Sequence, residues 1–108
     1  MDRDTFDQTH RLLILSRTLG QSLVIDGDLL LTLRRFEDGV ATVSVANLRD
    51  ENNAASIRLR QGEFAEVMPE VRITLLEPVD DRPRARFGLD VPLEIPVHRK
   101  EIFDAHER

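Results

Sequence analysis

The sequence predicts a mostly β domain of short strands and tight turns, with one short helix at its C-terminus. Two observations predict this class. Apolar and polar side chains alternate over several short stretches, which is the period of a half-buried strand. Clusters of Gly, Pro and Asp separate these stretches at short intervals, as turns do between strands. The chain has 108 residues, a length that fits one domain with its own hydrophobic core.

Four candidate strands lie in the first half of the chain. They are residues 13–15, 23–25, 29–36 and 40–46. The triplet at 26–28 (DGD) closes the second strand, because its Gly can adopt a positive φ. A tight turn at 37–39 joins the last two strands into a hairpin, and the polar stretch 47–53 (NLRDENN) is predicted to be a loop.

Four further candidate strands lie in the second half. They are residues 55–60, 71–77, 84–89 and 93–98. Residues 78–83 contain two prolines and are predicted to form a turn, and residues 90–92 form a further break. Pro96 places the last strand at a sheet edge or a bulge. The charged stretch from Arg99 carries apolar residues at a spacing that suits a short helix.

An internal repeat relates the two halves of the chain. Gly20 and Gly62 are 42 residues apart, and residues 29–33 lie over residues 71–75 at the same offset without a gap. We interpret residues 12–108 as one domain with two hairpin repeats, preceded by a tail or helical arm at 1–11. The repeats are expected at about 13–46 and about 55–103.

Composition excludes several classes of function. The chain has no Cys, so it has no disulfide, thiol nucleophile or cysteine-bound metal. Its apolar runs are too short to span a membrane, and its acidic N-terminus does not resemble a secretory signal, so we expect a cytoplasmic protein. With 15 basic and 20 acidic side chains the net charge is −5, which disfavours non-specific nucleic-acid binding.

No catalytic or metal-binding pattern is present in the sequence. His10, His98 and His106 do not have the spacing of metal ligands, and there is no Gly-rich phosphate loop. The acidic pair Asp80 and Asp81 lies in the predicted turn at 78–83 without a nearby base or nucleophile. We therefore expect neither an enzyme nor a cofactor or metal.

Three segments point to a family when they are taken in order. Residues 13–17 (LILSR) and 20–25 (GQSLVI) form the first, residues 86–92 (RFGLDVP) the second, and residues 95–103 (IPVHRKEIF) the third. In this order, with hairpins between them, they resemble the carbon storage regulator family (Csr or Rsm, including CsrA and RsmA). Members of that family are bacterial post-transcriptional regulators.

The resemblance implies a small β-sheet or barrel domain that forms an intertwined homodimer. In that family the first strand of one subunit and the last strand of the other form each RNA site. These sites hold GGA-containing single-stranded or loop RNA in mRNA leaders, and so control translation and mRNA decay. This chain is too long for one such subunit and looks like two fused end to end. Copy one lacks the last strand and helix, and copy two has a degenerate first strand.

A monomeric pseudo-dimer with one RNA site follows from this interpretation. Its alternative is a family subunit with an insertion that still forms a homodimer. The resemblance assigns seven residues to the site, namely Leu15, Ser16, Arg17, Val97, His98, Arg99 and Ile102. Arg11 and Lys100 are expected to extend the positive charge around Arg17 and Arg99, which would confine RNA binding to this patch.

Arg99 is the first candidate for contact with RNA and Arg17 the second, because a planar guanidinium can pair with guanine and bind phosphate. Leu15 and Ile102 are expected to provide an apolar floor. Each residue also has a structural alternative: an arginine at a strand end often forms an ion pair, and Leu15 and Ile102 suit the core.

A second function remains open, in which the chain is a degenerate Csr-like module that binds protein and not RNA. Its partner would be another Csr-type protein or an antagonist protein, since an exposed strand edge can accept a strand without positive charge. The family tends to carry a second basic residue after the first-strand arginine, and Thr18 stands there.

Overall fold

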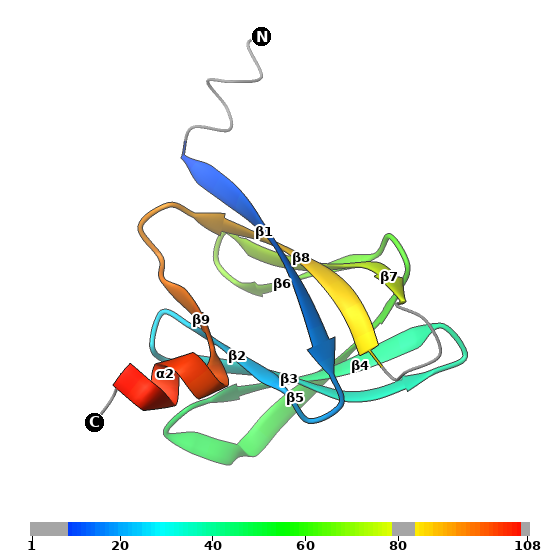
Figure 1. Cartoon of the computed structure of the whole chain (residues 1–108), viewed down its shortest axis with the longest axis horizontal. Coiled ribbons are helices and arrows are strands. Elements are labelled where there is room, and N and C mark those ends of the chain that lie inside the picture. Colours follow the sequence, from blue (N-terminus) through cyan, green and yellow to red (C-terminus); the bar gives the residue numbers. More distant parts are fainter. Residues whose placement is uncertain (1–8, 79–83, 107–108) are drawn as a thin grey trace, which may run out of the picture.

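The computed structural model describes residues 9–78 and 84–106. Nine strands and a short helix occur in these residues, so the predicted fold class is confirmed. The strands are β1 (His10–Thr18), β2 (Ser22–Ile25), β3 (Leu29–Glu37), β4 (Val40–Asn47), β5 (Asp50–Arg60), β6 (Phe64–Met68), β7 (Val71–Pro78), β8 (Arg84–Pro92) and β9 (Val97–Arg99). Helix α2 (Lys100–His106) follows β9 directly (Figure 1).

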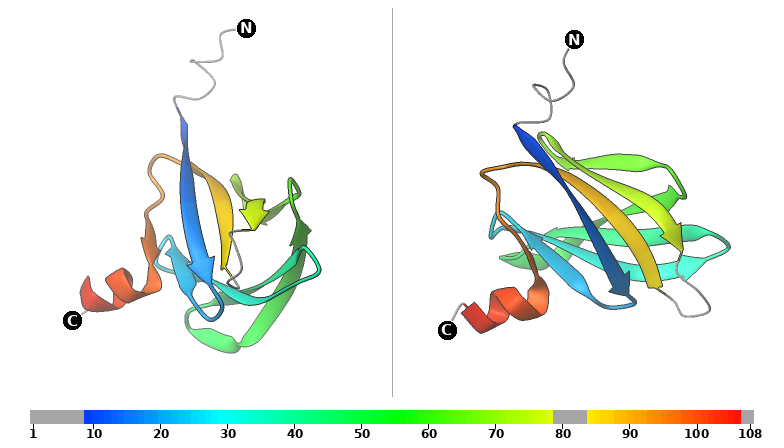
Figure 2. Two further views of the ribbon diagram at one scale, coloured as in Figure 1. Left: turned by 45° about the vertical axis from the view of Figure 1, so that its right-hand side comes forward. Right: turned by 45° about the horizontal axis from the view of Figure 1, so that its top comes forward.

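The strands form two antiparallel sheets that face each other (Figure 2). One sheet has the order β1-β8-β7-β6, and the other has the order β5-β4-β3-β2-β9. Each half of the chain therefore gives its first strand to the sheet of the other half: β1 pairs with β8, and β5 pairs with β4. The two halves exchange their first strands in the way that the two subunits of an intertwined dimer do.

The hydrophobic core lies between the sheets. Leu33 and Val43 contribute from the five-stranded sheet, and Ile73, Leu75 and Leu89 from the four-stranded sheet, all almost fully buried. These residues are the apolar members of the alternating stretches in the sequence, which is why one face of each sheet is apolar. Alternation therefore predicts which side chains fill the core.

The two halves repeat each other in backbone detail at the 42-residue offset. The Gly20 N–H donates to the Leu33 carbonyl and the Gly62 N–H to the Leu75 carbonyl, each at 2.7 Å. Both glycines have φ of +86°, which explains why Gly stands at each position. The strand exchange is also repeated, since β1 ends opposite the start of β8 and β5 ends opposite the start of β4.

The repeat ends at β9. This strand pairs with β2 and completes the five-stranded sheet. Strand β6 occupies the place of β2 in the other sheet, yet no described strand pairs with its outer edge. Burial reflects this difference, because β2 is buried throughout whereas Phe64 on β6 is 56% exposed.

Several predicted boundaries were wrong. The loop predicted at 47–53 is mostly strand, because β5 begins at Asp50 and Asn47 pairs with Asp50 across a tight turn. Strand β6 was not predicted. Strand β8 runs through the predicted break to Pro92, and residues 93–96 form a turn before the short β9. Pro96 lies just before the edge strand, as expected.

Other predictions lie partly or wholly outside the described residues. The arm was predicted at 1–11, but β1 already begins at His10. Residues 1–8 are not described. The turn residues 79–83, with Asp80 and Asp81, lie outside the described ranges, and so does the side chain of His106.

Candidate nucleic-acid interface

Strands β1 and β9 lie at neighbouring edges of the two sheets. Side chains from β1 connect these edges at both ends. At one end the Arg11 Nη2 donates to the Ile95 carbonyl at 2.9 Å. At the other end the Arg17 Nη1 lies 3.5 Å from the Glu101 Oε1 on α2. The predicted site residues on β1 and on β9–α2 are thus brought to one border of the molecule, which we call the β1–β9 site.

Arg17 belongs to the β1–β9 site, but its side chain is buried and does not lie on the protein surface. Its side chain is only 7% exposed. Its Nε donates to the Ser16 carbonyl at 2.8 Å and its Nη1 to the Ser22 carbonyl at 3.2 Å, besides the contact with Glu101. A guanidinium with these partners orients β1, β2 and α2, so the structure assigns Arg17 a positioning role. Its role as an RNA contact stays a prediction, and this geometry leaves little of its side chain exposed.

Arg99 and His98 are exposed at the β9 edge. No hydrogen bond or ion pair joins the Arg99 side chain to another residue in the described part of the chain. The His98 ring lies 6.4 Å from the Phe103 ring at 39°. A free planar cation beside an exposed imidazole is a suitable pair of groups for contacting RNA bases and phosphates.

The remaining predicted residues divide between core and surface. Leu15 and Val97 pack against the core and are half-buried, so the structural alternative given for Leu15 fits it. Ser16 is half-buried on β1. Ile102 is 46% exposed on α2, and Leu19 in the turn after β1 is 44% exposed. Sequence reasoning missed Leu19, although its place two residues after Arg17 puts it at the same border.

Charge around the β1–β9 site is more balanced than expected. Lys100 Nζ lies 2.7 Å from Asp104 Oδ2, one helical turn away. Glu101 accepts a hydrogen bond from its own backbone amide, which lowers the pKa of its carboxyl, and the positive charges of Arg17 and Arg99 lower this pKa further. Among the described cations predicted for this site, Arg99 is therefore the exposed one without an acidic partner in contact.

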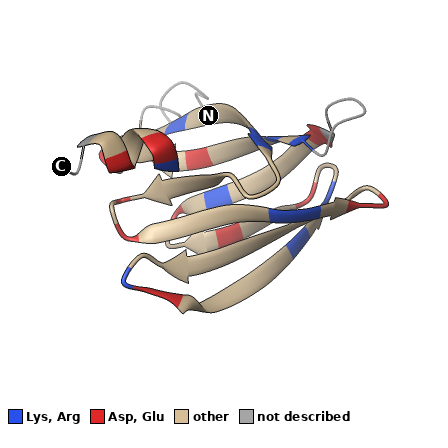
Figure 3. Ribbon diagram, turned by 60° about the horizontal axis from the view of Figure 1, so that its bottom comes forward, with Lys and Arg blue, Asp and Glu red and all other residues tan. Residues whose placement is uncertain are grey.

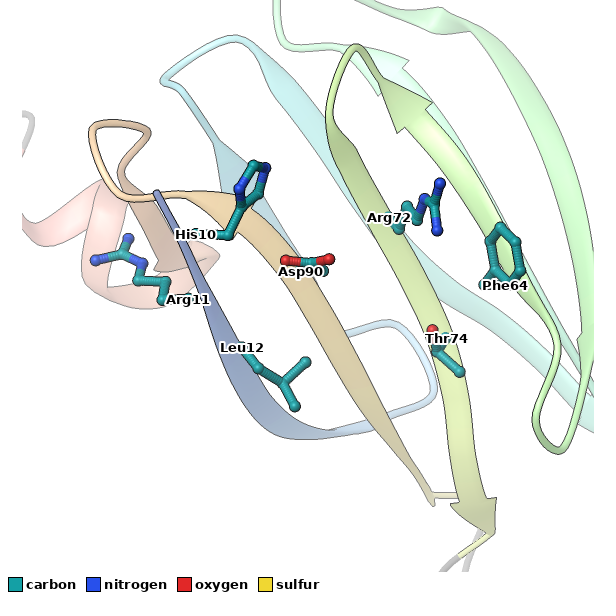
Figure 4. Close-up of a pocket in the computed structure, with 7 residues that line it drawn as sticks. All are labelled: His10, Arg11, Leu12, Phe64, Arg72, Thr74 and Asp90. Atoms are coloured by element: carbon teal, nitrogen blue, oxygen red, sulfur yellow. The ribbon is translucent and has the colours of Figure 1, made fainter. Parts of the chain in front are cut away.

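A hollow lies on the outer face of the four-stranded sheet, away from the core (Figure 4). It has a volume of about 480 Å³ and lies between β1 and β6. The Arg72 guanidinium lies over the Phe64 ring at 4.8 Å, and Asp90 lies between His10 and Arg72 in the close-up. This hollow therefore holds basic and acidic side chains next to each other.

No group of three or more His, Cys, Asp or Glu side chains that could hold a metal ion occurs within residues 9–78 and 84–106. In the same part of the chain, no helix has the length and hydrophobicity needed to cross a membrane.

The comparison with known proteins decides the family. A translational regulator, CsrA of Rhodopirellula baltica (strain DSM 10527 / NCIMB 13988 / SH1), is 33% identical over 49 residues, which cover 45% of this chain and 67% of that protein. The chain belongs to the CsrA family. No family model matches the chain, and no solved structure matches it. A CsrA relationship agrees with the family that the sequence segments suggested.

In this CsrA-family fold, the repeat places a position equivalent to the β1–β9 site on β5, and its residues differ from those of the β1–β9 site. Leu59 stands 42 residues after Arg17 and is 3% exposed within the core. No described strand or helix takes the place of β9 and α2 beside β6. Arg17, which connects β1 to α2, therefore has an apolar counterpart, Leu59, at a position beside which no described helix lies.

Proposed function

We propose that this protein is a post-transcriptional regulator that binds GGA-containing single-stranded or loop RNA in mRNA leaders and modulates translation and mRNA decay. The observation that carries the proposal is the exposed Arg99, next to His98, on an edge strand held beside β1. Exposed guanidinium and imidazole groups at a strand edge suit unpaired bases. Family membership supports an RNA partner.

The proposal includes a tandem-fused architecture with a single RNA site. The exchange of first strands between the two halves supports fusion of two family units in one chain. The outer edge of β6, which no described strand pairs with, and the apolar Leu59 support loss of the second site. The protein would act in the cytoplasm as a monomer, without enzymatic activity or a cofactor.

A hairpin RNA with GGA in its loop tests the proposal. We expect wild-type protein to bind it in a fluorescence anisotropy assay more tightly than a hairpin with a changed loop. Arg99→Ala should lose about 1–3 kcal/mol, or about 5- to 150-fold in affinity, and should discriminate less between the two loops. Arg49→Ala is the matched control, because Arg49 is also an exposed arginine. Equal binding by wild type and Arg99→Ala would refute the site.

The alternative function, a protein-binding module, is favoured by one observation. Strand β6 leaves its outer edge without a described partner strand, beside the exposed Phe64. An edge of this kind can accept an extended segment of another protein. Wild-type protein that binds a Csr-type protein or its antagonist, and binds no GGA hairpin, would establish this alternative.

A further inference from the structure

A hollow lined by arginines lies on the outer face of the five-stranded sheet, away from the β1–β9 site. It has a volume of about 450 Å³. Its lining consists of Arg35, Glu37, Asp38, Val40, Thr42, Arg58 and Arg60. Figure 3 shows basic segments of β3 and β5 on either side of β4 at this end of the sheet. We call this feature the arginine hollow.

A β-bulge explains why the arginines gather on one face. Leu33 pairs with Val43 and Arg35 with Thr42, so Arg34 is an extra residue in β3. The Arg34 Nε donates to the Ser44 Oγ at 3.1 Å, which shows that Arg34 joins Arg35 on the outer face. A bulge turns two consecutive side chains towards the same side of a sheet. Arg34 therefore adds a fourth positive charge beside the arginine hollow.

Strand β5 supplies the other two arginines. Arg58 pairs with Thr42, and Arg60 pairs with Val40 in the next row. The side chains of Arg58 and Arg60 make no hydrogen bond or ion pair with another residue in the described ranges. The Arg35 Nε lies 3.5 Å from the Glu37 Oε1, but both side chains are largely exposed. Ion pairs between exposed side chains contribute little to the stability of a protein. Two acids, Glu37 and Asp38, also line the hollow. The four arginines outnumber them, so the arginine hollow keeps an excess of positive charge.

The repeat provides an internal comparison for this cluster. At the 42-residue offset, Arg58 and Arg60 correspond to Ser16 and Thr18, while Arg34 and Arg35 correspond to Leu76 and Glu77. The bulge is kept in the other sheet, where the register shifts between Leu75 and Glu77. There Glu77 pairs with Arg86 at 2.6 Å. On the four-stranded sheet the same backbone therefore carries an ion pair in place of the arginine cluster, so the fold itself does not require the arginines.

We propose that the arginine hollow binds the phosphate backbone of single-stranded RNA flanking the element held at the β1–β9 site. The inference rests on the proposed function. Strand β5 lies four strand spacings from β9 in the same sheet, about 19 Å away, so one RNA can reach both. One guanidinium group can donate two parallel hydrogen bonds to the oxygens of one phosphate. The lining contains no aromatic ring on which a base could stack, so the contact is independent of sequence.

Two RNAs and two double variants test this assignment. The RNAs are the GGA hairpin alone and the same hairpin with oligouridine tails of about ten nucleotides on both sides. The variants are Arg58→Ala/Arg60→Ala and the control Arg72→Ala/Arg86→Ala, which removes equal charge from the opposite sheet. Binding is measured by fluorescence anisotropy from 50 to 200 mM salt.

We expect Arg58→Ala/Arg60→Ala to bind the hairpin alone as wild type does, and to bind the tailed RNA more weakly. Its salt slope for tailed RNA should be smaller by about 1.4, since each neutralised phosphate of a single strand contributes about 0.7. The ratio of wild-type affinity to Arg58→Ala/Arg60→Ala affinity for tailed RNA should then fall about sevenfold as the salt rises from 50 to 200 mM. The control variant should keep the wild-type slope.

The outcomes separate this inference from the proposed function. Equal affinity and slope for wild type and Arg58→Ala/Arg60→Ala on tailed RNA would overturn the inference, even if the hairpin binds. Loss of hairpin binding in wild type would overturn the proposed function. The arginine hollow would still be supported if free oligouridine bound wild type and not Arg58→Ala/Arg60→Ala. Competition by polyglutamate equal to that by oligouridine would contradict the assignment to RNA.

Discussion

The substitution Arg17→Leu tests the role of the buried Arg17 side chain in the β1–β9 site. The repeat places Leu59 at the equivalent position, fully inside the core, so the backbone around Arg17 should accept leucine. The substitution removes two hydrogen bonds from a charged donor to the carbonyls of Ser16 and Ser22, a loss of about 3 kcal/mol. Burial of the leucine side chain returns about 2 kcal/mol.

We therefore expect Arg17→Leu to lower the free energy of unfolding by only about 1 kcal/mol. Arg17→Ala lacks the compensating burial and leaves a space, so its loss should be about 3 kcal/mol or more. Urea denaturation at neutral pH measures both values, provided that the slope with denaturant is unchanged. Glu101 adds little to the cost because it is 55% exposed and remains hydrated without Arg17.

The RNA assay completes this prediction. Arg17→Leu keeps the fold but loses the contacts from Arg17 to Ser22 on β2 and to Glu101 on α2. Its affinity for the GGA hairpin should therefore fall while its stability remains near that of wild type. An Arg17→Leu protein as unstable as Arg17→Ala would refute the equivalence of Arg17 and Leu59. An unchanged RNA affinity would refute the positioning role of Arg17.

Three other predictions concern the repeat, acid and the oligomeric state. Gly20→Ala and Gly62→Ala should each lower stability by about 1–2 kcal/mol in urea denaturation, because both have positive φ and no neighbour crowds the added methyl group; a neutral effect at either site would contradict the repeat. Since the folded pKa of Glu101 is lowered from 4.5, its contribution is present above that pH and lost as the pH falls through the folded pKa. Wild type and Glu101→Gln should accordingly converge in stability in acid, and a constant difference would count against the contact. Sedimentation equilibrium should find a monomer at micromolar concentration, whereas a stable dimer would refute the tandem-fused interpretation.

The hairpin of β3 and β4 was predictable because both strands have one buried face. Alternation along residues 40–46 places Val43 in the core and leaves Thr42 on the other side. Strand β5 was mispredicted at its start for the opposite reason. Residues 50–56 are exposed throughout, and an edge strand exposed on both faces has no apolar alternation to detect. The 42-residue offset, applied to β2, would have indicated β6.

The sequence predicted which elements of the candidate site lie side by side, but not the surroundings of each side chain. Family segments located Arg17 and Arg99 correctly on adjoining elements. Sequence alone could not show that Arg17 is buried, because burial depends on where α2 and β2 lie relative to β1. The arginine hollow was also beyond prediction, since a bulge in β3 and the pairing of β5 with β4 bring its residues together.

A nuclear magnetic resonance titration with the short GGA hairpin tests the central claim most directly. We expect saturation at one RNA per chain, with backbone amide shifts concentrated on β9, the start of α2 and the Arg17 end of β1. Amides of β5 and β6 should remain unchanged with this tail-free RNA. Two RNAs bound per chain, or shifts centred on β5 and β6, would contradict the single β1–β9 site.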